Sequence, residues 1–291
     1  MKAYFDLTKF GIALFVMITG LAGYAVAFPL GQPVEFGYPF LLVIGLYLVS
    51  SGSFAINQAQ EWRQDKQMPR TAKRPIAMGV VQPWQAYFLG TIFCIFGVFL
   101  LTLINAQTGL LAFATVVLYN GIYTLYWKKH WAFGAVPGAI PGAMPVMIGF
   151  AAGGGDFFDP ECIYLFLVMF LWQMPHFWAL AIRYKDDYSK GGFPVLPAEI
   201  GVERTLYQIG LYTFAYVGVA LAAPLFVNAH VNYLILVIPF ALKVMWEFVK
   251  YYKSGGEKKW LPFFLWLNLS MLVFISVPVF DRWLFYFLIT A

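Results

Sequence analysis

Long apolar segments separated by short polar connections run through the whole chain. Each segment is close to the ~20 residues that an α-helix needs to cross the hydrocarbon core of a bilayer. Only 11% of the residues are charged and 61% are hydrophobic, whereas about 25% are charged in soluble domains. We therefore expect an all-α, polytopic membrane protein. Nine spans are expected, at residues 10–29, 38–56, 85–104, 108–126, 134–152, 162–182, 205–227, 232–249 and 262–280.

The series of apolar segments is not divided into domains. No linker, low-complexity tract or shift in composition interrupts it, so we expect one transmembrane domain over residues 1–291. The first segment contains Ala25-Val26-Ala27, which imitates a signal-peptidase site. Its apolar run exceeds the about 7 to 15 residues of a signal peptide, which indicates a retained membrane helix. The apolar tail at 283–291 is expected to extend the last helix.

Charged residues gather in the connections at one end of the expected bundle. Nine spans place the N-terminus and the connections after the second, fourth, sixth and eighth spans on one side, which receives nearly all Lys and Arg; Arg282 is the exception. By the positive-inside rule this side is cytoplasmic. We expect a protein of the cell inner membrane with its N-terminus and polar loops in the cytoplasm. The net charge of +5 reflects this orientation and does not indicate nucleic-acid binding.

The most polar stretch follows the second expected span, at residues 57–75. Asn57, Glu61 and Asp65 are spaced four apart, which places their oxygens along one helical face at steps of about 6 Å. Proteins usually hold Mg²⁺ by one or two carboxylates together with the phosphates of a substrate. We therefore expect this face to bind Mg²⁺.

Basic residues surround these acids and recur after the fourth and sixth spans. Guanidinium groups match phosphate oxygens in pairs, and lysines supply point charges. Metal-binding acids beside such cations predict a site for a metal-bound diphosphate. The alternative is that these charges neutralise one another on a solvated loop. The basic residues expected to bind the diphosphate are Arg63, Lys66, Arg70, Arg74, Lys128, Lys129 and Arg183.

The sixth expected span carries a polar stripe. His176, Arg183 and Asp187 share one helical face, with Gln173 beside it. A polar stripe on a membrane helix faces the protein interior or a cavity. We expect Gln173 and His176 to contact an acceptor molecule, and Asp186 and Asp187 to add metal ligands. The alternative for His176 is a structural role, satisfied by hydrogen bonds inside the bundle.

These motifs resemble those of UbiA-type intramembrane prenyltransferases. The pattern Asn-x-x-x-Glu-x-x-x-Asp-x-x-Met-x-Arg-Thr-x-x-Arg-Pro, which begins at Asn57, resembles their first aspartate-rich motif. Its ending, the Trp-Gln-Met-Pro-His of residues 172–176 and the short acidic pair that follows are similar to the haem O synthase branch. Many relatives carry Asp where this chain has Gln58 and Glu61; Glu61 still offers a ligand oxygen.

The resemblance implies a helical bundle around a central cavity that opens to the cytoplasmic loops. It implies transfer of a farnesyl group from farnesyl diphosphate to a vinyl group of haem B, with Mg²⁺ as the cofactor. It also implies a downstream partner, a haem A synthase or a terminal oxidase assembly. The residues expected to be catalytic are Asn57, Glu61, Asp65, His176 and Asp187.

His176 is expected to contact the haem, either as an axial ligand of the iron or as a base. It precedes Asp187 by 11 residues, roughly 16 Å along a helix, which suits the distance from a diphosphate to the far end of an extended prenyl chain. His130, beside two lysines, is the competing ligand; alternatively it assists the diphosphate or only anchors the topology.

Two other functions fit part of the pattern. A quinone-type aromatic prenyltransferase uses the same diphosphate chemistry but needs no imidazole near an iron. A small-molecule transporter fits the number of spans, but it should place charges at mid-membrane in inverted halves. The fourth span and the last three spans carry few polar side chains, and we expect no catalytic group from them.

Overall fold

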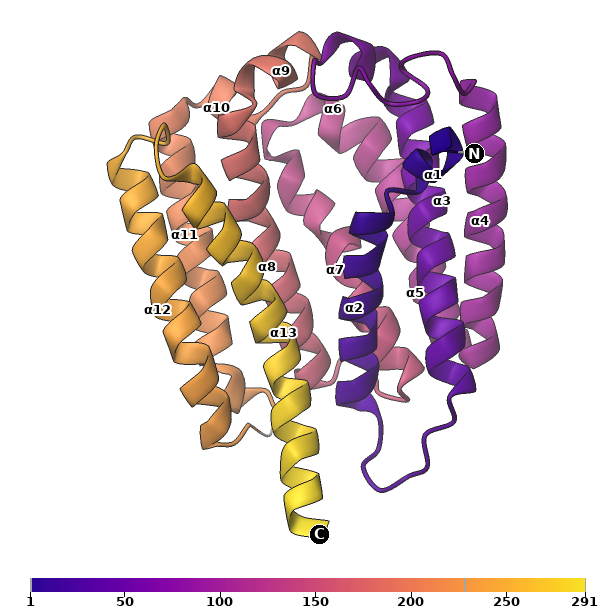
Figure 1. Ribbon diagram of the computed structural model, residues 1–291, viewed down its shortest axis with the longest axis vertical. Coiled ribbons are helices and arrows are strands. Elements are labelled where there is room, and N and C mark those ends of the chain that lie inside the picture. Colours follow the sequence, from indigo (N-terminus) through magenta and orange to yellow (C-terminus); the bar gives the residue numbers. More distant parts are fainter. Residues whose placement is uncertain (1, 228, 291) are drawn as a thin grey trace.

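The computed structural model describes residues 2–227 and 229–290, and this part of the chain contains helices and no strand. Long helices run side by side as a bundle, and most of the short helices lie at one end of it, while η3 joins α11 to α12 at the other (Figure 1). The long elements are α2 (Phe10–Ala27), α3 (Gly37–Gln67), α4 (Pro83–Ile104), α5 (Ala106–Val116) with η1 (Val117–Trp127), α7 (Ala135–Ala152), α8 (Pro160–Arg183), α11 (Val202–Leu221), α12 (Val231–Lys253) and α13 (Trp260–Thr290). The short ones are α1 (Lys2–Thr8), α6 (Lys128–His130), η2 (Ala132–Gly134), α9 (Lys185–Lys190), α10 (Leu196–Glu199) and η3 (Ala223–Leu225).

Within the described residues, eight helices are long and apolar enough to cross a membrane. The expected span that is not among these eight, the seventh at 205–227, corresponds to α11, which ends at Leu221 and carries Glu203 and Arg204 in its first turn. α11 packs against α8 and α12 (Figure 1). The expectation of an all-α, multi-pass membrane bundle is confirmed, and the count of nine spans is approximate. The extension of the last helix is confirmed as far as Thr290.

Close approach between helices depends on glycine at two interfaces. A β-carbon on Gly52 of α3 would lie 2.6 Å from the carbonyl oxygen of Gly90 in α4. A β-carbon on Gly149 of α7 would overlap the backbone of Gly20 in α2. Small residues are typical of membrane helix interfaces, because association in lipid depends on van der Waals packing. These contacts fix α2, α3 and α7, which surround the site.

α7 stays helical through Pro141 and Pro145 and packs against its neighbour α8. Gln173 of α8 donates its Nε2 hydrogen to the carbonyl oxygen of Ala139 at 3.1 Å. Gly142 leaves the space for this contact, since a β-carbon there would overlap the Gln173 amide. Gln173 thereby ties α8 to α7 in the proline-containing part of α7.

The second half of the fourth span, η1, is a π-helix tied to α3. The Thr124 hydroxyl donates to the carbonyl oxygen of Tyr119, five residues earlier, at 2.8 Å. Gln60 donates to the Asn120 carbonyl oxygen at 2.9 Å, and the Asn120 amide donates to the Ser53 carbonyl oxygen at 2.9 Å. π-Helical turns often occur at functional sites. This span therefore buries polar side chains, Asn120 and Thr124, whereas the expectation that it offers no catalytic group stays a prediction.

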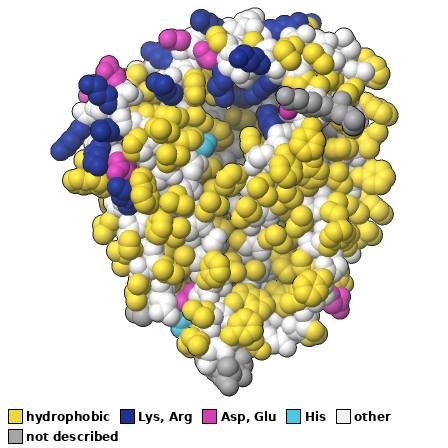
Figure 2. Space-filling view, viewed as in Figure 1, with side chains coloured by type: hydrophobic (Ala, Val, Ile, Leu, Met, Phe, Trp, Pro, Cys, Tyr) yellow, Lys and Arg dark blue, Asp and Glu magenta, His cyan; other side chains and the backbone are white. Residues whose placement is uncertain are grey.

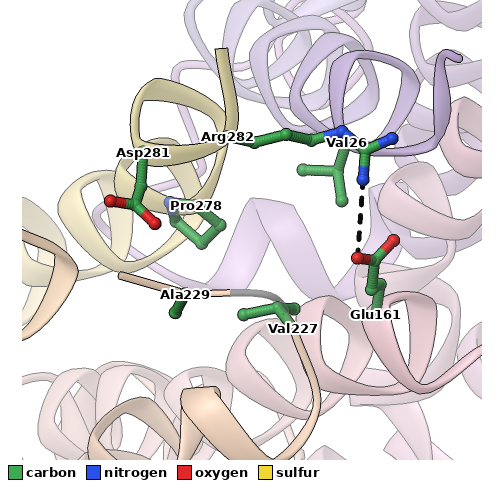
Figure 3. A pocket seen from close by; sticks show the side chains of 7 residues that line it. All are labelled: Val26, Glu161, Val227, Ala229, Pro278, Asp281 and Arg282. Carbon is green, nitrogen blue, oxygen red and sulfur yellow. Dashed lines mark ion pairs between the residues drawn. The ribbon is translucent and has the colours of Figure 1, made fainter. Parts of the chain in front are cut away.

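The two ends of the bundle differ in charge. Figure 2 shows Lys and Arg side chains gathered at one end, above a broad hydrophobic surface. At the other end, Arg282 lies 3.5 Å from Glu161 and donates to the carbonyl oxygen of Phe28 at 3.3 Å (Figure 3). These groups border a small pocket of about 20 Å³, which is room for one water molecule. The exception to the charge pattern is therefore an ion-paired residue.

Candidate active site

A cavity of about 580 Å³ lies inside the bundle. Helices α2, α3, α7, α8 and α13 and the π-helix η1 form its wall, and its mouth lies among the basic side chains, where the surface is hollowed (Figure 2). The cavity therefore has a charged entrance and extends from there into the space between the membrane helices. The polar and aromatic lining residues used below are Lys9, Phe54, Asn57, Arg70, Arg74, Tyr119, Tyr123, Lys128, Trp172, Gln173, His176, Tyr188 and Asn268.

The polar face expected on α3 is present, and each of its acids has a cationic partner. Asn57, Glu61 and Asp65 occupy the last three turns of α3 and are only 3%, 1% and 1% exposed. Arg74 donates to both carboxylate oxygens of Asp65 at 2.7 Å. Lys128 lies 2.6 and 2.7 Å from the two oxygens of Glu61. The fork and the ion pair neutralise two carboxylates that would otherwise be buried as free charges.

Asn57 is oriented by the π-helix. Its Nδ2 donates to the Thr124 hydroxyl at 3.2 Å, which leaves Oδ1 available beside the cavity. An amide oxygen and two carboxylates on one face form the all-oxygen donor set that Mg²⁺ prefers, so these residues fit the metal. Among the described residues, no three His, Cys, Asp or Glu side chains come together. The protein thus supplies few ligands, which suits a metal ion whose coordination is completed by the phosphates of a substrate.

The second acidic pair reaches the cavity mouth from α9. Asp187 accepts the backbone N–H of Arg70 at 3.3 Å. The Arg70 guanidinium donates to the Tyr188 hydroxyl at 3.3 Å and lies over the Tyr184 ring, 5.1 Å from its centroid. Asp186 is exposed. The loops after α3 and α8 therefore meet, as their charges led us to expect, while metal binding by Asp186 and Asp187 stays a prediction.

Several predicted cations point away from the cavity. Arg63 and Lys66 are exposed and pack over the Trp62 ring, 5.4 and 4.6 Å from its centroid. Arg183 is exposed and lies 5.8 Å from the Trp260 ring centroid. The cations that line the cavity are Lys9, Arg70, Arg74 and Lys128.

The two histidines occupy different surroundings. His130 is exposed on α6, with Nδ1 2.8 Å from the Tyr126 carbonyl oxygen; neither it nor Lys129 belongs to the cavity wall as the described residues form it. His176 lines the cavity on α8, and its Nδ1 is buried without a hydrogen-bond partner among the described residues. The alternative that His176 is purely structural, with all of its hydrogen bonds made inside the bundle, is therefore not supported. Gln173 also lines the cavity, although its amide is engaged with α7.

Lys9 is a site residue that the sequence analysis treated only as a flanking charge. It joins α1 to α2 in the left-handed region, with φ 46° and ψ 52°, and its Nζ lies 5.2 Å from the Phe54 ring centroid. Burial, together with the positive charges of Arg74 and Lys128, lowers the pKa of Lys9 to about 7. A lysine before the first span looks the same in sequence whether it anchors the topology or enters a site.

Tyr119 and Tyr123 were also missed. They lie one turn apart on η1, their rings stack at a centroid distance of 5.9 Å, and both line the cavity. Aromatic faces attract positive charge. Tyrosine in an apolar span is common at membrane interfaces, so its presence alone gave no signal of a site.

Membrane helices around a cavity, with the cations of two buried acid–base pairs in its lining, form the kind of site expected of an intramembrane enzyme. The profile of the UbiA prenyltransferase family matches residues 16–269, and the chain belongs to this family. A protoheme IX farnesyltransferase from Bdellovibrio bacteriovorus is 53% identical over 99% of both chains. A relative of the same name from Leptospira biflexa is 35% identical over 94% of this chain and 96% of its own length.

Solved structures share the fold at low identity. A digeranylgeranylglyceryl phosphate synthase superposes with a TM-score of 0.77 and 19% identity, over 96% of this chain and 98% of its own. A UbiA homologue from Aeropyrum pernix gives 0.75 and 18% over 93% and 98%. A homologue from Archaeoglobus fulgidus bound to GPP and Mg²⁺ gives 0.68 and 16% over 94% and 99%. The expected bundle is thus confirmed as a UbiA fold.

Proposed function

We propose that the protein transfers a farnesyl group from farnesyl diphosphate to a vinyl group of haem B, as a protoheme IX farnesyltransferase does. The near full-length similarity to proteins of that name supports this reaction. The single structural observation that carries it is one cavity lined by His176 and by Arg74 and Lys128, the two cations that pair with Asp65 and Glu61 just behind the lining. The same proposal places the mouth in the cytoplasm, at the inner membrane, and leaves product transfer to a haem A synthase or a terminal oxidase assembly.

At the mouth, the residues bind and neutralise the leaving group. Asn57, Glu61 and Asp65 would hold Mg²⁺ through their oxygens. When bound, the metal supplies positive charge to the diphosphate as its C–O bond to the farnesyl group breaks. Arg74 and Lys128, released from the acids, then contact phosphate oxygens. The leaving diphosphate takes the electron pair of the broken bond.

Further in, the cavity protects the allylic cation. Tyr119 and Tyr123 present stacked rings beside Asn57, and ring faces stabilise positive charge. The surrounding helices exclude water until the vinyl carbon attacks. The new C–C bond leaves a cation on the haem side, and water adds there and loses a proton, which gives a hydroxyethylfarnesyl group. His176 is placed to ligate the haem iron or to accept that proton.

The test is direct synthesis by the purified protein. Incubation with haem B, farnesyl diphosphate and Mg²⁺ should give the farnesylated haem, identified by mass. Asp65→Asn should lower turnover by at least about 10²-fold, since it removes a carboxylate that would hold the Mg²⁺ at the leaving diphosphate, whereas Arg63→Gln should not. A haem titration of wild type, His176→Ala and His130→Ala, followed at the Soret band, tests the iron ligand. No haem product from wild type, or product only with a quinone precursor as acceptor, would refute the proposal.

A further inference from the structure

Lys9 lines the cavity with an ammonium group that forms neither a hydrogen bond nor an ion pair within the described part of the chain. Arg74 and Lys128, in the same lining, are each bound to a carboxylate of α3. Lys9 is half-buried, and its Nζ lies 5.2 Å from the centroid of the Phe54 ring. An anion in the cavity can therefore bind Lys9 without separating an existing ion pair.

The backbone at Lys9 turns sharply between α1 and α2. Its φ of 46° and ψ of 52° lie in the left-handed region, which is unfavourable for a residue with a side chain. Such a conformation persists only where the surrounding structure holds it. The position of Lys9 therefore depends on what holds α1, the seven-residue helix before it.

α1 is held by α3, beside which it lies in Figure 1. Gln58 of α3 donates its Nε2 hydrogen to the carbonyl oxygen of Leu7 at 3.0 Å. This carbonyl belongs to the last turn of α1, where the carbonyl groups have no partner within their own helix. The Leu7 side chain is fully buried in one apolar cluster with Ala55 and Ala59 of α3. The two contacts fix the end of α1 directly before Lys9.

Gln58 stands within the acidic motif of α3 but lies outside the cavity lining. It is only 1% exposed, whereas its neighbour Asn57 lines the cavity. The contact with Leu7 is the one side-chain hydrogen bond that Gln58 makes among the described residues. A carboxylate at this position would have no hydrogen to donate to a carbonyl oxygen. The amide is therefore suited to hold α1 and not to bind a ligand in the cavity.

We propose that Gln58 is a positioning residue for diphosphate binding: by holding the Leu7 carbonyl it keeps the α1–α2 turn in place, so that Lys9 binds a phosphate oxygen in the cavity. This inference rests on the diphosphate part of the proposed function and does not depend on the acceptor. Lys9 adds a positive charge to those of Arg74 and Lys128, and its use leaves no buried acid unpaired.

Calorimetry of pyrophosphate binding with Mg²⁺ to the purified protein tests whether Gln58 acts through Lys9. Gln58→Met removes the donor at similar size and should weaken binding by about three- to tenfold, as expected for the loss of one hydrogen bond. In the Lys9→Met background the same change should have no further effect, because the group that it positions is gone. Gln67→Met, at the exposed end of α3, is the matched control and should bind as wild type does. Equal losses from Gln58→Met in both backgrounds, or no loss in either, would overturn the proposal.

The anchoring of α1 is measured separately. Leu7→Ala loosens the same segment from its apolar side and should weaken pyrophosphate binding in wild type but not in Lys9→Met. Hydrogen exchange of the backbone amides of residues 2–8, read by mass spectrometry, should be faster in Gln58→Met than in wild type and unchanged in Gln67→Met. Unchanged exchange in Gln58→Met would show that the amide does not hold α1, and the inference would fail.

Formation of the haem product separates this inference from the proposed function. Wild type that binds pyrophosphate and shows the Lys9-dependent loss, but makes no haem product, contradicts the proposed reaction and supports the role of Gln58. Wild type that makes the haem product while Gln58→Met keeps full pyrophosphate affinity contradicts the role of Gln58 alone.

Discussion

Asp65 and Glu61 are each bound to a basic side chain, and this pairing sets the conditions for metal binding. Nη1 of Arg74 donates to both carboxylate oxygens of Asp65 at 2.7 Å, and Lys128 forms an ion pair with Glu61. An unpaired buried charge is strongly destabilising, so neither cation leaves without a replacement. A divalent metal replaces them at the acids, and a diphosphate gives them new partners. We therefore expect metal and diphosphate to bind together, each weakly without the other.

Arg74→Gln should separate the two ligands. Mn²⁺ alone should bind at least about tenfold more tightly, a gain of ~1.4 kcal/mol, because Asp65 is released. Pyrophosphate with Mg²⁺ should bind more weakly, because a phosphate partner is lost. Paramagnetic resonance measures the Mn²⁺ affinity, and calorimetry measures the affinity for pyrophosphate with Mg²⁺. Arg63→Gln, on the exposed side of α3, is the control. Equal Mn²⁺ affinity in wild type and Arg74→Gln would contradict the exchange.

Lys9 should make diphosphate binding depend on pH near neutrality. Its pKa is lowered from 10.5 to about 7 by burial first and by Arg74 and Lys128 second. A bound anion favours the protonated form, so binding takes up a proton and affinity falls as pH rises above about 7. Calorimetry of pyrophosphate binding with Mg²⁺ from pH 6 to 9 should show this decline in wild type.

Two methionine substitutions test this role of Lys9: Lys9→Met removes the charge, and Lys129→Met is the control. Lys9→Met should bind pyrophosphate about tenfold more weakly at pH 6, and its affinity should change less with pH. Lys129→Met lies outside the cavity wall and should behave as wild type. If Lys9→Met keeps the full pH dependence, another group titrates.

The sequence predicted those site residues whose relative positions follow from helical spacing, and it missed those that only the packing of distant segments brings to the site. Asn57, Glu61 and Asp65 were found because a spacing of four fixes a helical face whatever surrounds it. Lys9, just before the first span, and Asn268, inside the last, were missed because neither stands in a motif and only packing brings each to the cavity. Arg63 was included on charge alone, and Arg183 because a continuous helix would place it on one face with His176 and Asp187; α8 ends at Arg183, and both arginines are exposed.

At the scale of helices, the glycine interface of α3 and α4 should tolerate no side chain. Gly52→Ala would place a β-carbon 2.6 Å from the Gly90 carbonyl oxygen, and such overpacking costs about 1–3 kcal/mol. Gly218→Ala in α11 meets nothing within 4 Å and should stabilise the helix by up to about 1 kcal/mol. Unfolding in detergent, followed by circular dichroism, compares the two. The interface argument fails if Gly52→Ala is as stable as Gly218→Ala.

Helices were easier to predict than their irregularities. Apolar runs of membrane length located the spans, because a backbone in lipid must satisfy its own hydrogen bonds. The π-helix η1 was not foreseen, since it depends on bonds to distant residues such as Gln60 to Asn120. α11 was expected to be longer and more apolar than it is, because the sequence after Leu221 stays apolar although the helix has ended.

At the scale of the whole molecule, the charge pair away from the active end should contribute stability alone. Glu161→Gln leaves Arg282 with only the Phe28 carbonyl oxygen, and we expect a loss of about 1–2 kcal/mol for these partly shielded groups. Thermal unfolding should detect this loss, while pyrophosphate binding should not change. A variant with normal stability, or with altered binding, would show that the pair has another role.

The pairing of the two acids has a consequence for synthesis in the membrane. The partner of Asp65 follows nine residues later, so it leaves the ribosome almost together with the acid. The partner of Glu61 follows 67 residues later, after two further spans. During that interval Glu61 ends an inserted helix without its counter-charge, and burying it early would be costly. The end of α3 should therefore remain in contact with water until the π-helix and Lys128 arrive, so the metal-binding face closes only when the fourth span is in place.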